Sequence, residues 1–342
     1  MPQDVPIPLP FTPVTGQSAH TAGSSSGPDA GAARARSLAW CERHRLVNDP
    51  VAAERFTDWD IAGLMAAWIP GAAGERLDLA VDAVAVAAFL DEQFDGPAGA
   101  RPERVEAVCA AFRAVTAGHR AAPGAPPLVV AFADVWRRLC AGASAPWVRA
   151  AARHWHGFLE AYAEEARGRV RRREPGRAEH FALRRRSGFV FAMLDLSQKA
   201  YGFELPPDAH RDPLLARMAD ITADVVDALN AVYSLEKEEA RGDRHNLVLA
   251  LEGRGGGSRD ECLARVRELV LHWCEEFLTL ETMLLEGEHA RTGRDAEVPA
   301  RFTEAMRCAM SGYLAWGRDC RRYAVPVPAG GPVPLADLVG AR

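Results

Sequence analysis

The sequence predicts an all-α protein, a bundle of about ten or more helices, and three observations support this fold class. Apolar residues recur at helical spacing through most of the chain between residues 35 and 323. No alternation of apolar and polar residues is long enough to indicate a strand. In addition, 48% of the 342 residues are hydrophobic, so the chain can bury one large core or two modest ones.

The predicted helices are the stretches in which apolar residues recur three and four positions apart, since this spacing places them on one helix face. In chain order they are Ala35–His44, Pro50–Ala67, Leu77–Phe94, Pro102–Ala117, Pro127–Leu139, Ala145–Arg171, Ala178–Gly202, Pro213–Ala240, Arg259–Glu286 and Ala300–Tyr323. Interior sites in such bundles are built by side chains from facing helices.

Gly188 lies inside the predicted helix 178–202. A glycine at such a position costs about 1 kcal/mol relative to alanine. Two explanations remain open. The helix breaks there and turns a backbone carbonyl toward the interior, or two helices pack closely at this point.

Composition and the chain ends narrow the class of protein. Residues 1–34 are too rich in Pro, Gly and Ser to make a core, so we expect a flexible segment there, a body at 35–325 and a tail at 326–342. The net charge of −5 argues against a nucleic-acid binder. Seven cysteines without zinc-like spacing, no signal peptide and an apolar run at 77–90 too short to span a bilayer predict a cytoplasmic protein without stable membrane insertion.

A first cluster of oxygen ligands follows that apolar run. The residues LDLAVDAVAVAAFL are apolar nearly all round, which is typical of a helix buried in a large core, and Asp91, Glu92 and Asp95 come directly after them. A helix C-terminus already carries partial negative charge, so each carboxylate there is unfavourable by roughly 0.3–1 kcal/mol if exposed and by more if buried. Something positive must compensate, unless the acids simply form a frayed helix end in water.

A second cluster lies at four-residue spacing in the predicted helix 213–240. Asn230, Ser234 and Glu238 form a polar strip beside its apolar face, although Asn and Ser are mediocre helix formers. One amide oxygen, one hydroxyl and one carboxylate, completed by water and phosphate oxygens, suit octahedral Mg²⁺. The alternative is a solvated polar face. Lys237 adds a cation beside the strip, for an anionic ligand or for a neighbouring glutamate.

Together the two clusters resemble the metal motifs of bacterial class I terpene synthases. DEQFD at 91–95 is similar to the aspartate-rich motif of that family, and the strip at 230–238 to its second motif, Asn-Asp-x-x-Ser-x-x-x-Glu. Arg184, 46 residues before Asn230, stands where the family has an arginine that senses the pyrophosphate.

Two further features fit the same resemblance, which covers roughly residues 35–325. Ser187 and Gly188 fall at the family's linker and helix-break effector positions, and Arg322 with Tyr323 matches its closing Arg-Tyr pair. The implied fold is a single-domain helical bundle around a central apolar cavity. In this family the N-terminal segment can close over the site, so Phe11 and its neighbouring prolines are candidates for a lid.

The resemblance also implies the role of each candidate residue. The expected metal ligands are Asp91, Asp95, Asn230, Ser234 and Glu238, holding three Mg²⁺ ions. The expected diphosphate contacts are Arg184, Lys237, Arg322 and Tyr323, and the expected catalytic residues are Arg184, Ser187 and Gly188. Ala87, Ala88, Phe89, Phe189, Phe191 and Trp316 are candidates for the pocket lining, although each of these aromatics could equally be an ordinary core residue.

The implied reaction is Mg²⁺-dependent ionisation and cyclisation of a prenyl diphosphate, with farnesyl diphosphate as the expected substrate and a cyclic sesquiterpene as the product. The substrate is the expected partner, and a homodimer stays open. Three departures from the family pattern matter: Glu92 replaces an aspartate, Ala231 replaces the second motif's aspartate, and Ala87 and Ala88 replace bulky aromatics. The alanines leave room for geranylgeranyl diphosphate.

Two other functions are compatible with the same residues. A chain-elongating prenyltransferase also uses acidic Mg²⁺ sites on helices, but it normally has two aspartate-rich motifs, whereas the second cluster here carries Asn, Ser and Glu. A helical binding protein without enzymatic activity is the other alternative.

Overall fold

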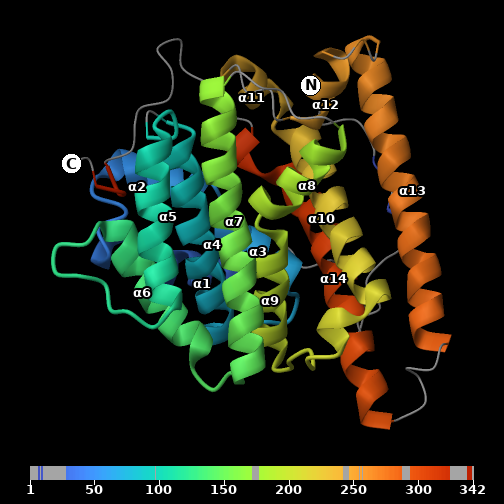
Figure 1. Ribbon diagram of the computed structural model, residues 1–342, viewed down its shortest axis with the longest axis horizontal. Coiled ribbons are helices and arrows are strands. Elements are labelled where there is room, and N and C mark those ends of the chain that lie inside the picture. Colours follow the sequence, from blue (N-terminus) through green and yellow to red (C-terminus); the bar gives the residue numbers. More distant parts are fainter. Residues whose placement is uncertain are drawn as a thin grey trace.

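The computed structural model is a bundle of α-helices with short 3₁₀ turns (Figure 1). It describes residues 7, 9, 10, 28–96, 98–171, 177–241, 246–253, 255, 257–286, 293–323 and 337–340. No strand occurs in these ranges. The predicted all-α fold is therefore confirmed. Among the helices of these ranges, none is long and apolar enough to cross a membrane.

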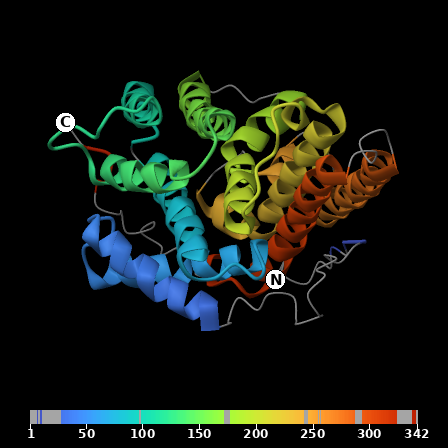
Figure 2. The same ribbon diagram turned by 90° about the horizontal axis from the view of Figure 1, so that it is seen from below.

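The helices in chain order are α1 Pro28–Arg43, α2 Pro50–Asp58, α3 Ile61–Trp68, α4 Gly74–Phe94, α5 Pro102–Thr116, α6 Pro127–Cys140, α7 Ala145–Arg171, α8 Arg177–Ser187, α9 Val190–Tyr201, α10 Pro213–Tyr233, α11 Leu235–Arg241, α12 Leu247–Gly253, α13 Arg259–Glu286 and α14 Gly293–Asp319. The 3₁₀ turns are η2 Ala209–Arg211 and η4 Arg321–Tyr323. The two views place α13 at one side of the bundle and α5 and α6 at the opposite side (Figures 1 and 2).

Helix α4 lies in the core between other helices. It packs against α1, α3, α6 and α9, and its residues from Leu77 to Leu90 are buried except for the half-buried Asp78. The prediction of a helix buried in a large core is thus confirmed. One charged group is buried with it. Asp82 is 3% exposed and accepts a hydrogen bond of 2.9 Å from Arg138, while burial raises the pKa of Asp82 to about 6.

Helices α10, α13, α14 and α3 form the other side of the core. One close approach occurs where Gly312 of α14 meets the backbone of α3. A Cβ atom on this glycine would lie 2.2 Å from the carbonyl oxygen of Ala67, so only glycine permits this approach.

Three predicted helices are each divided in two. The segment 50–67 breaks at Asp60, which takes a left-handed conformation with φ of 49° and caps α3 by accepting from the Gly63 N–H at 3.3 Å. Asp60 also pairs with Arg34, and its carbonyl accepts a 3.1 Å hydrogen bond from the Trp316 indole. These tertiary contacts stabilise a break that helical periodicity alone could not indicate.

The other two breaks lie in the segments 178–202 and 213–240. The first separates α8 from α9 at Gly188 and Phe189, and Phe189 has a φ of 62°. The second is milder: Ser234 caps α10, and backbone bonds from Ser234 to Asn230 and from Glu238 to Ser234 carry the helical pattern into α11. The expected four-residue spacing of the polar strip is therefore retained.

The ends of the body differ from the expected boundaries. Helix α1 begins at Pro28 instead of residue 35, because Ala30 and Ala33 are buried against the core. Ile7 is also buried, whereas Phe11 and most of the expected lid lie outside the described residues. Residues 337–340 of the expected tail pack on the body through the Leu338 N–H, which donates to Gln93 Oε1 at 3.1 Å.

The last helix also differs from its prediction. The segment expected at 300–323 forms α14 from Gly293 to Asp319, followed by η4. Helix α12 was not predicted, because its seven residues are too few to show a clear periodicity.

A pair between a half-buried imidazole and a buried carboxylate joins α7 to α9 outside the central cavity. His154 Nδ1 lies 2.7 Å from Asp195 Oδ2, and Asp195 is 4% exposed. Burial acts to lower the pKa of His154, but the charge of Asp195 and its hydrogen bond outweigh burial, so the pKa is raised. The protonated imidazole is therefore more favourable in the folded chain than in the unfolded one.

This pair predicts a pH-dependent contribution to stability. A histidine with a raised folded pKa stabilises the fold fully below its unfolded pKa, about 6.5, and this stabilisation is lost as the pH rises through the folded value. His154→Gln should therefore lower the free energy of unfolding more at about pH 5.5 than at about pH 9. Urea unfolding at both pH values measures this difference.

His156 on the same helix is the matched control. Burial lowers its pKa, and its Nε2 lies 2.7 Å from Thr116 Oγ1. His156→Gln should not show the extra loss at low pH, and the same pH dependence in both variants would contradict the assignment to Asp195.

Candidate active site

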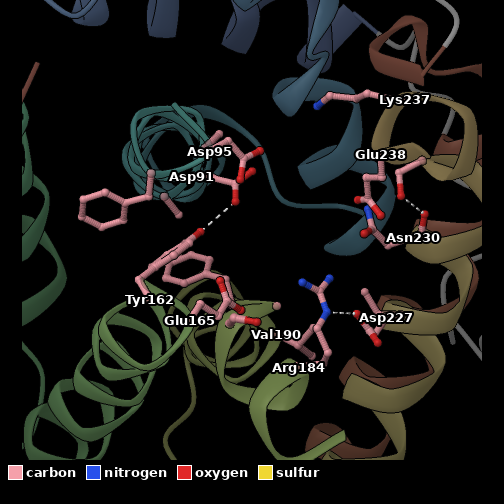
Figure 3. A pocket seen from close by; sticks show the side chains of 18 of the residues that line it. Asp91, Asp95, Tyr162, Glu165, Arg184, Val190, Asp227, Asn230, Lys237 and Glu238 are labelled. Atoms are coloured by element: carbon pink, nitrogen blue, oxygen red, sulfur yellow. Dashed lines mark hydrogen bonds and ion pairs between the residues drawn. The ribbon is translucent and has the colours of Figure 1, made fainter. Parts of the chain in front are cut away.

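The helices enclose a cavity of about 1250 Å³. Its walls come from α4 and α7 on one side, α10 and α11 on the facing side, and the α8–α9 break and η4 between them. Figure 3 shows the carboxylates of α4 facing the polar side chains of α10 and α11 across the open space, with Arg184 between the two walls. The structure thus brings together candidates that lie far apart in the sequence, such as Asp91 and Tyr323, which are 232 residues apart.

The α4 wall changes from polar to apolar along the helix. Asp91, Ala88, Ala87 and Val84 all line the cavity. At a rise of about 1.5 Å per residue, Val84 lies about 10 Å along the axis from Asp91. The cavity therefore has an acidic end and an apolar end, which suits a ligand with a charged head and a hydrocarbon tail.

Asp91 is held by two side chains from other elements. Tyr162 of α7 donates to Asp91 Oδ1 at 2.8 Å, and Arg322 of η4 donates to Oδ2 at 3.2 Å. Burial, followed by the charge of Asp91, raises the pKa of Tyr162 well above its ordinary value, so its hydroxyl remains a donor. Asp95 is exposed at the end of α4 and also lines the cavity.

Glu92 lies beside these acids but is not among the residues that line the cavity. Its side chain is 5% exposed and pairs with Arg55 of α2 at 2.5 Å and with Lys237 of α11 at 3.4 Å. The alternative of a frayed acidic helix end in water is therefore excluded for Glu92, whose side chain lies behind the cavity wall. The pair with Lys237 also joins the two walls.

The facing wall contains the row Asn230, Ser234 and Glu238. The Asn230 amide nitrogen donates to the hydroxyls of Tyr313 at 2.9 Å and Tyr323 at 3.0 Å, which leaves its oxygen as the ligand atom. Ser234 Oγ donates to the Asn230 carbonyl at 2.6 Å, so its lone pairs remain available as an acceptor.

Glu238 is positioned by Asn246, a residue just before α12. The Asn246 amide nitrogen donates to Glu238 Oε2 at 2.8 Å and to the Ala231 carbonyl at 2.7 Å. Its oxygen accepts from the backbone N–H groups of Val248 and Leu249, at 2.8 and 3.3 Å. One buried amide thus fixes both the start of α12 and the carboxylate of α11.

Arg184 enters the cavity from the last turn of α8. Its Nε donates to Asp227 Oδ1 at 2.7 Å, and Asp227 is 5% exposed. Arg185 and Arg186 do not line the cavity, because successive residues of a helix point about 100° apart. They pair with Asp224 and Glu164, respectively.

The expected helix break follows directly. Ser187, Gly188 and Phe189 all line the cavity. A Cβ atom on Gly188 would approach the carbonyl oxygen of Arg184 to 3.0 Å, and Ser187 Oγ is buried without a hydrogen-bond partner among the described side chains. Of the two explanations for Gly188, the structure supports the helix break.

The lining candidates divide into two groups. Ala87, Ala88, Phe189 and Trp316 line the cavity, whereas Phe89 and Phe191 do not. Phe89 points away from Ala88 on the same helix and packs between Phe56 and Trp59, with ring centroids 5.6 and 5.0 Å apart. Phe191 packs on His154 at 5.7 Å. The expectation of a lining role for these two residues was wrong, because each lies on the opposite face of its helix.

Sequence reasoning missed several polar residues of the cavity, among them Tyr162, Glu165, Asp227 and Tyr313. Asp227 had a detectable signal, since it lies three residues before Asn230 and so shares its helix face. The other three had none, because they belong to α7 and α14 and meet the motifs only through packing.

The donors in the cavity fit a divalent metal by their chemistry. Carboxylate, amide and hydroxyl oxygens are the ligands of hard cations such as Mg²⁺. Within the described ranges, no three His, Cys, Asp or Glu side chains are grouped closely enough to hold an ion by themselves. A metal here would need the amide, hydroxyl and carboxylate oxygens of the facing wall together with oxygens from a bound ligand. Mg²⁺ is commonly bound in this way.

Comparison with known proteins places the chain in one family. Residues 82–276 match the family model described as terpene synthase family 2, C-terminal metal binding. Pentalenene synthase of Streptomyces arenae is 34% identical over 94% of both chains. The 7-epi-alpha-eudesmol synthase of Streptomyces viridochromogenes, described as farnesyl diphosphate cyclizing, is 30% identical over 99% of this chain and 97% of its own.

A solved structure shows the same fold. The linalool/nerolidol synthase of Streptomyces clavuligerus, in complex with 2-fluorogeranyl diphosphate, superimposes with a TM-score of 0.78 at 32% identity, over 85% of this chain and 99% of that one.

The role of Asn246 predicts a loss of stability that a surface asparagine does not share. Asn246→Ala should lower the free energy of unfolding by about 2 kcal/mol, because it removes a helix cap and leaves buried groups unpaired. Asn48 is exposed and makes one hydrogen bond, to the Arg45 carbonyl. Asn48→Ala should change stability by less than about 0.5 kcal/mol. Equal effects in urea unfolding would contradict the assigned contacts.

Proposed function

Since this chain belongs to the bacterial class I terpene synthases, enzymes that act on prenyl diphosphates, we propose that it ionises and cyclises farnesyl diphosphate to a sesquiterpene with Mg²⁺ as its metal. One observation carries the proposal. At one end of a single cavity, two oxygen-rich walls face each other with a guanidinium between them, and the other end has an apolar lining. Such a cavity matches a diphosphate joined to a hydrocarbon chain.

The metal ligands in this proposal are Asp91 and Asp95 on α4 and the row Asn230, Ser234 and Glu238 on the facing wall. The motif's usual aspartate is Ala231, which is 3% exposed and only supplies a carbonyl to Asn246. The wall still has three oxygen ligands at four-residue spacing, and these can bind a metal ion without the missing aspartate. The family itself is described as metal-binding.

The cations around the metal-ligand walls would bind the diphosphate oxygens. In the structure, each of three cations pairs with a carboxylate: Arg322 with Asp91, Lys237 with Glu92 and Arg184 with Asp227. A bound diphosphate can accept charge-assisted hydrogen bonds from these groups and from the Tyr323 hydroxyl. Bound Mg²⁺ would supply Lewis-acid stabilisation of the leaving group, which requires no proton transfer.

The apolar end would protect the resulting carbocation. Leu64, Val84, Met193 and Val226 help to exclude water there, and the faces of Phe189 and Trp316 can stabilise a cation through their quadrupoles. The helix break at Gly188 would present backbone dipoles to the same region. No nucleophilic side chain is required, because the cation rearranges by itself.

Two observations bear on the chain length of the substrate. A relative described as farnesyl diphosphate cyclizing aligns with 99% of this chain, which supports the C15 substrate. Ala87 and Ala88 line the cavity one turn from Asp91, and their small side chains favour a second candidate, geranylgeranyl diphosphate. Incubation with C10, C15 and C20 diphosphates, followed by gas chromatography and mass spectrometry, decides between them.

Isopentenyl diphosphate should be included in the same assay. Only a chain-elongating transferase consumes it, so its consumption would contradict cyclisation. Absence of metal-dependent pyrophosphate release from all three substrates would leave the enzyme proposal without support and favour a binding protein.

If Asp91 and Glu238 are metal ligands, replacing them should affect turnover much more than stability. Asp91→Asn and Glu238→Gln should each lower turnover by on the order of 100-fold or more, because Lewis-acid stabilisation of a leaving group is worth several kcal/mol. Stability should change little, since each amide keeps the size of the carboxylate and an oxygen that can accept a hydrogen bond. Pyrophosphate release and thermal unfolding measure the two effects.

Asp78→Asn provides the control on the same helix. Asp78 pairs with Arg36 on the outer side of α4, at 2.6 and 2.8 Å, and does not line the cavity. Its replacement should leave turnover unchanged. Unfolding of the Asp91 and Glu238 variants under assay conditions would indicate a structural role instead.

Ala87 and Ala88 should influence which substrate chain length the enzyme prefers. Replacing both Ala87 and Ala88 by Phe should disfavour the C20 substrate relative to the C15 substrate, because added bulk in a packed site costs about 1–3 kcal/mol. The two single variants show which position is responsible. An unchanged C20/C15 ratio and product mixture in the double variant would mean that these positions do not limit the cavity.

A further inference from the structure

The contacts of Arg184 differ from those of its neighbour Arg185, although both leave α8 and reach a buried aspartate of α10. Arg185 uses all three of its nitrogens, with Nε and one terminal nitrogen on Asp224 and the other on Asp220, at 2.7–2.8 Å. Arg184 uses Nε alone, for its 2.7 Å bond to Asp227. Its two terminal nitrogens make no hydrogen bond to another described residue and point into the cavity (Figure 3).

The geometry of a guanidinium explains why this contact matters. The group is planar and its donors are fixed relative to one another, so a bond at Nε determines where the two terminal nitrogens point. Asp227 is 5% exposed and itself lines the cavity, three residues before Asn230 on the same helix face. The carboxylate therefore sits behind Arg184 and directs its free edge toward the space between the two ligand walls.

The carboxylates around Arg184 keep its guanidinium positively charged. Burial acts to lower the pKa of Arg184, but the carboxylates of Asp227 on α10, Glu238 on α11 and Glu165 on α7 outweigh burial and raise the pKa well above its ordinary value. Of these three, Asp227 is the one that also makes a hydrogen bond to the guanidinium.

We propose that Asp227 is a positioning residue for the diphosphate site: its carboxylate clamps Nε of Arg184 and so holds the two terminal nitrogens in place to receive the diphosphate. This inference rests on the proposed function, because it takes the anion at Arg184 to be a diphosphate. Asp227 itself does not contact the anion, and its effect passes through Arg184.

The test uses inorganic pyrophosphate with Mg²⁺ as the ligand and titration calorimetry as the readout. Asp227→Ala should weaken pyrophosphate binding by about tenfold, which corresponds to about 1.4 kcal/mol, and should lower kcat as well. Asp227→Asn retains an oxygen that can accept from Nε, so its loss should be smaller. This variant also keeps the test decisive if the alanine variant does not fold.

A double-mutant cycle tests whether the effect passes through Arg184. In the background of Arg184→Gln, the further change Asp227→Ala should leave pyrophosphate affinity nearly unchanged, because the group that it positions is already absent. Additive losses would mean that Asp227 acts independently of Arg184, which would overturn the proposal.

Asp224→Ala is the matched control. Asp224 is 2% exposed and holds Arg185 by the same kind of ion pair, but neither residue lines the cavity. Its removal should lower the melting temperature as the Asp227 variant does, yet leave pyrophosphate affinity at the wild-type value. An equal loss of affinity in this control would reduce Asp227 to a general structural role.

The remaining outcomes are also decisive. Unchanged or tighter pyrophosphate binding by Asp227→Ala would show that the carboxylate only opposes the anion, and would overturn this inference alone. Absence of Mg²⁺-dependent pyrophosphate binding by the wild-type protein would overturn the proposed function, and this inference with it.

Discussion

The arrangement of the cavity depends on the need to balance negative charge inside an apolar bundle. Asp91, Glu92, Asp227 and Glu238 lie at or near the cavity, at positions where water can stabilise them only in part. Each isolated carboxylate would be costly there. Arg322, Arg55, Lys237 and Arg184 supply the balancing charge, and Tyr162 and Asn246 supply hydrogen bonds. These contacts also join separate elements: the ion pairs of Asp91 and Glu92 link α4 to η4, α2 and α11, and the pair of Arg184 with Asp227 links α8 to α10.

The helix breaks have a common consequence for the cavity. The break at Asp60 brings α3 against α14, and Leu64 of α3 and Trp316 of α14 both line the apolar end. The break at Gly188 and Phe189 ends α8 just after Arg184, and η4 after α14 brings Arg322 to Asp91. Uninterrupted helices would direct these side chains elsewhere. Local irregularity in the backbone thus positions residues that regular helices could not bring together.

Much of the fold and of the candidate site could be predicted because the relevant patterns are local. Asn230, Ser234 and Glu238 lie on one helix face at fixed spacing, and the acids after Leu90 sit at the end of a run that is apolar on all sides. The all-α class follows from the same periodicity. These features survive in the structure because helix geometry alone determines them.

The errors concern contacts that only packing determines. Phe89 is next to Ala88 in the sequence but faces Phe56 and Trp59, because adjacent helical residues point about 100° apart. The break at Asp60 depends on Arg34 and Trp316, distant residues with no local signal. Asn246 donates a hydrogen bond to Glu238, and Tyr162 donates one to Asp91. Neither donor belongs to a motif, so the sequence did not indicate these contacts.

The central claim is that the two facing walls hold divalent ions around a diphosphate, and anomalous diffraction tests it most directly. Crystals grown with Mn²⁺ and inorganic pyrophosphate should show anomalous peaks beside Asp91 on α4 and beside Asn230, Ser234 and Glu238 on the opposite wall. The pyrophosphate should lie between them, within hydrogen-bonding distance of Arg184. Pyrophosphate bound elsewhere, or peaks confined to sites outside this cavity, would contradict the account.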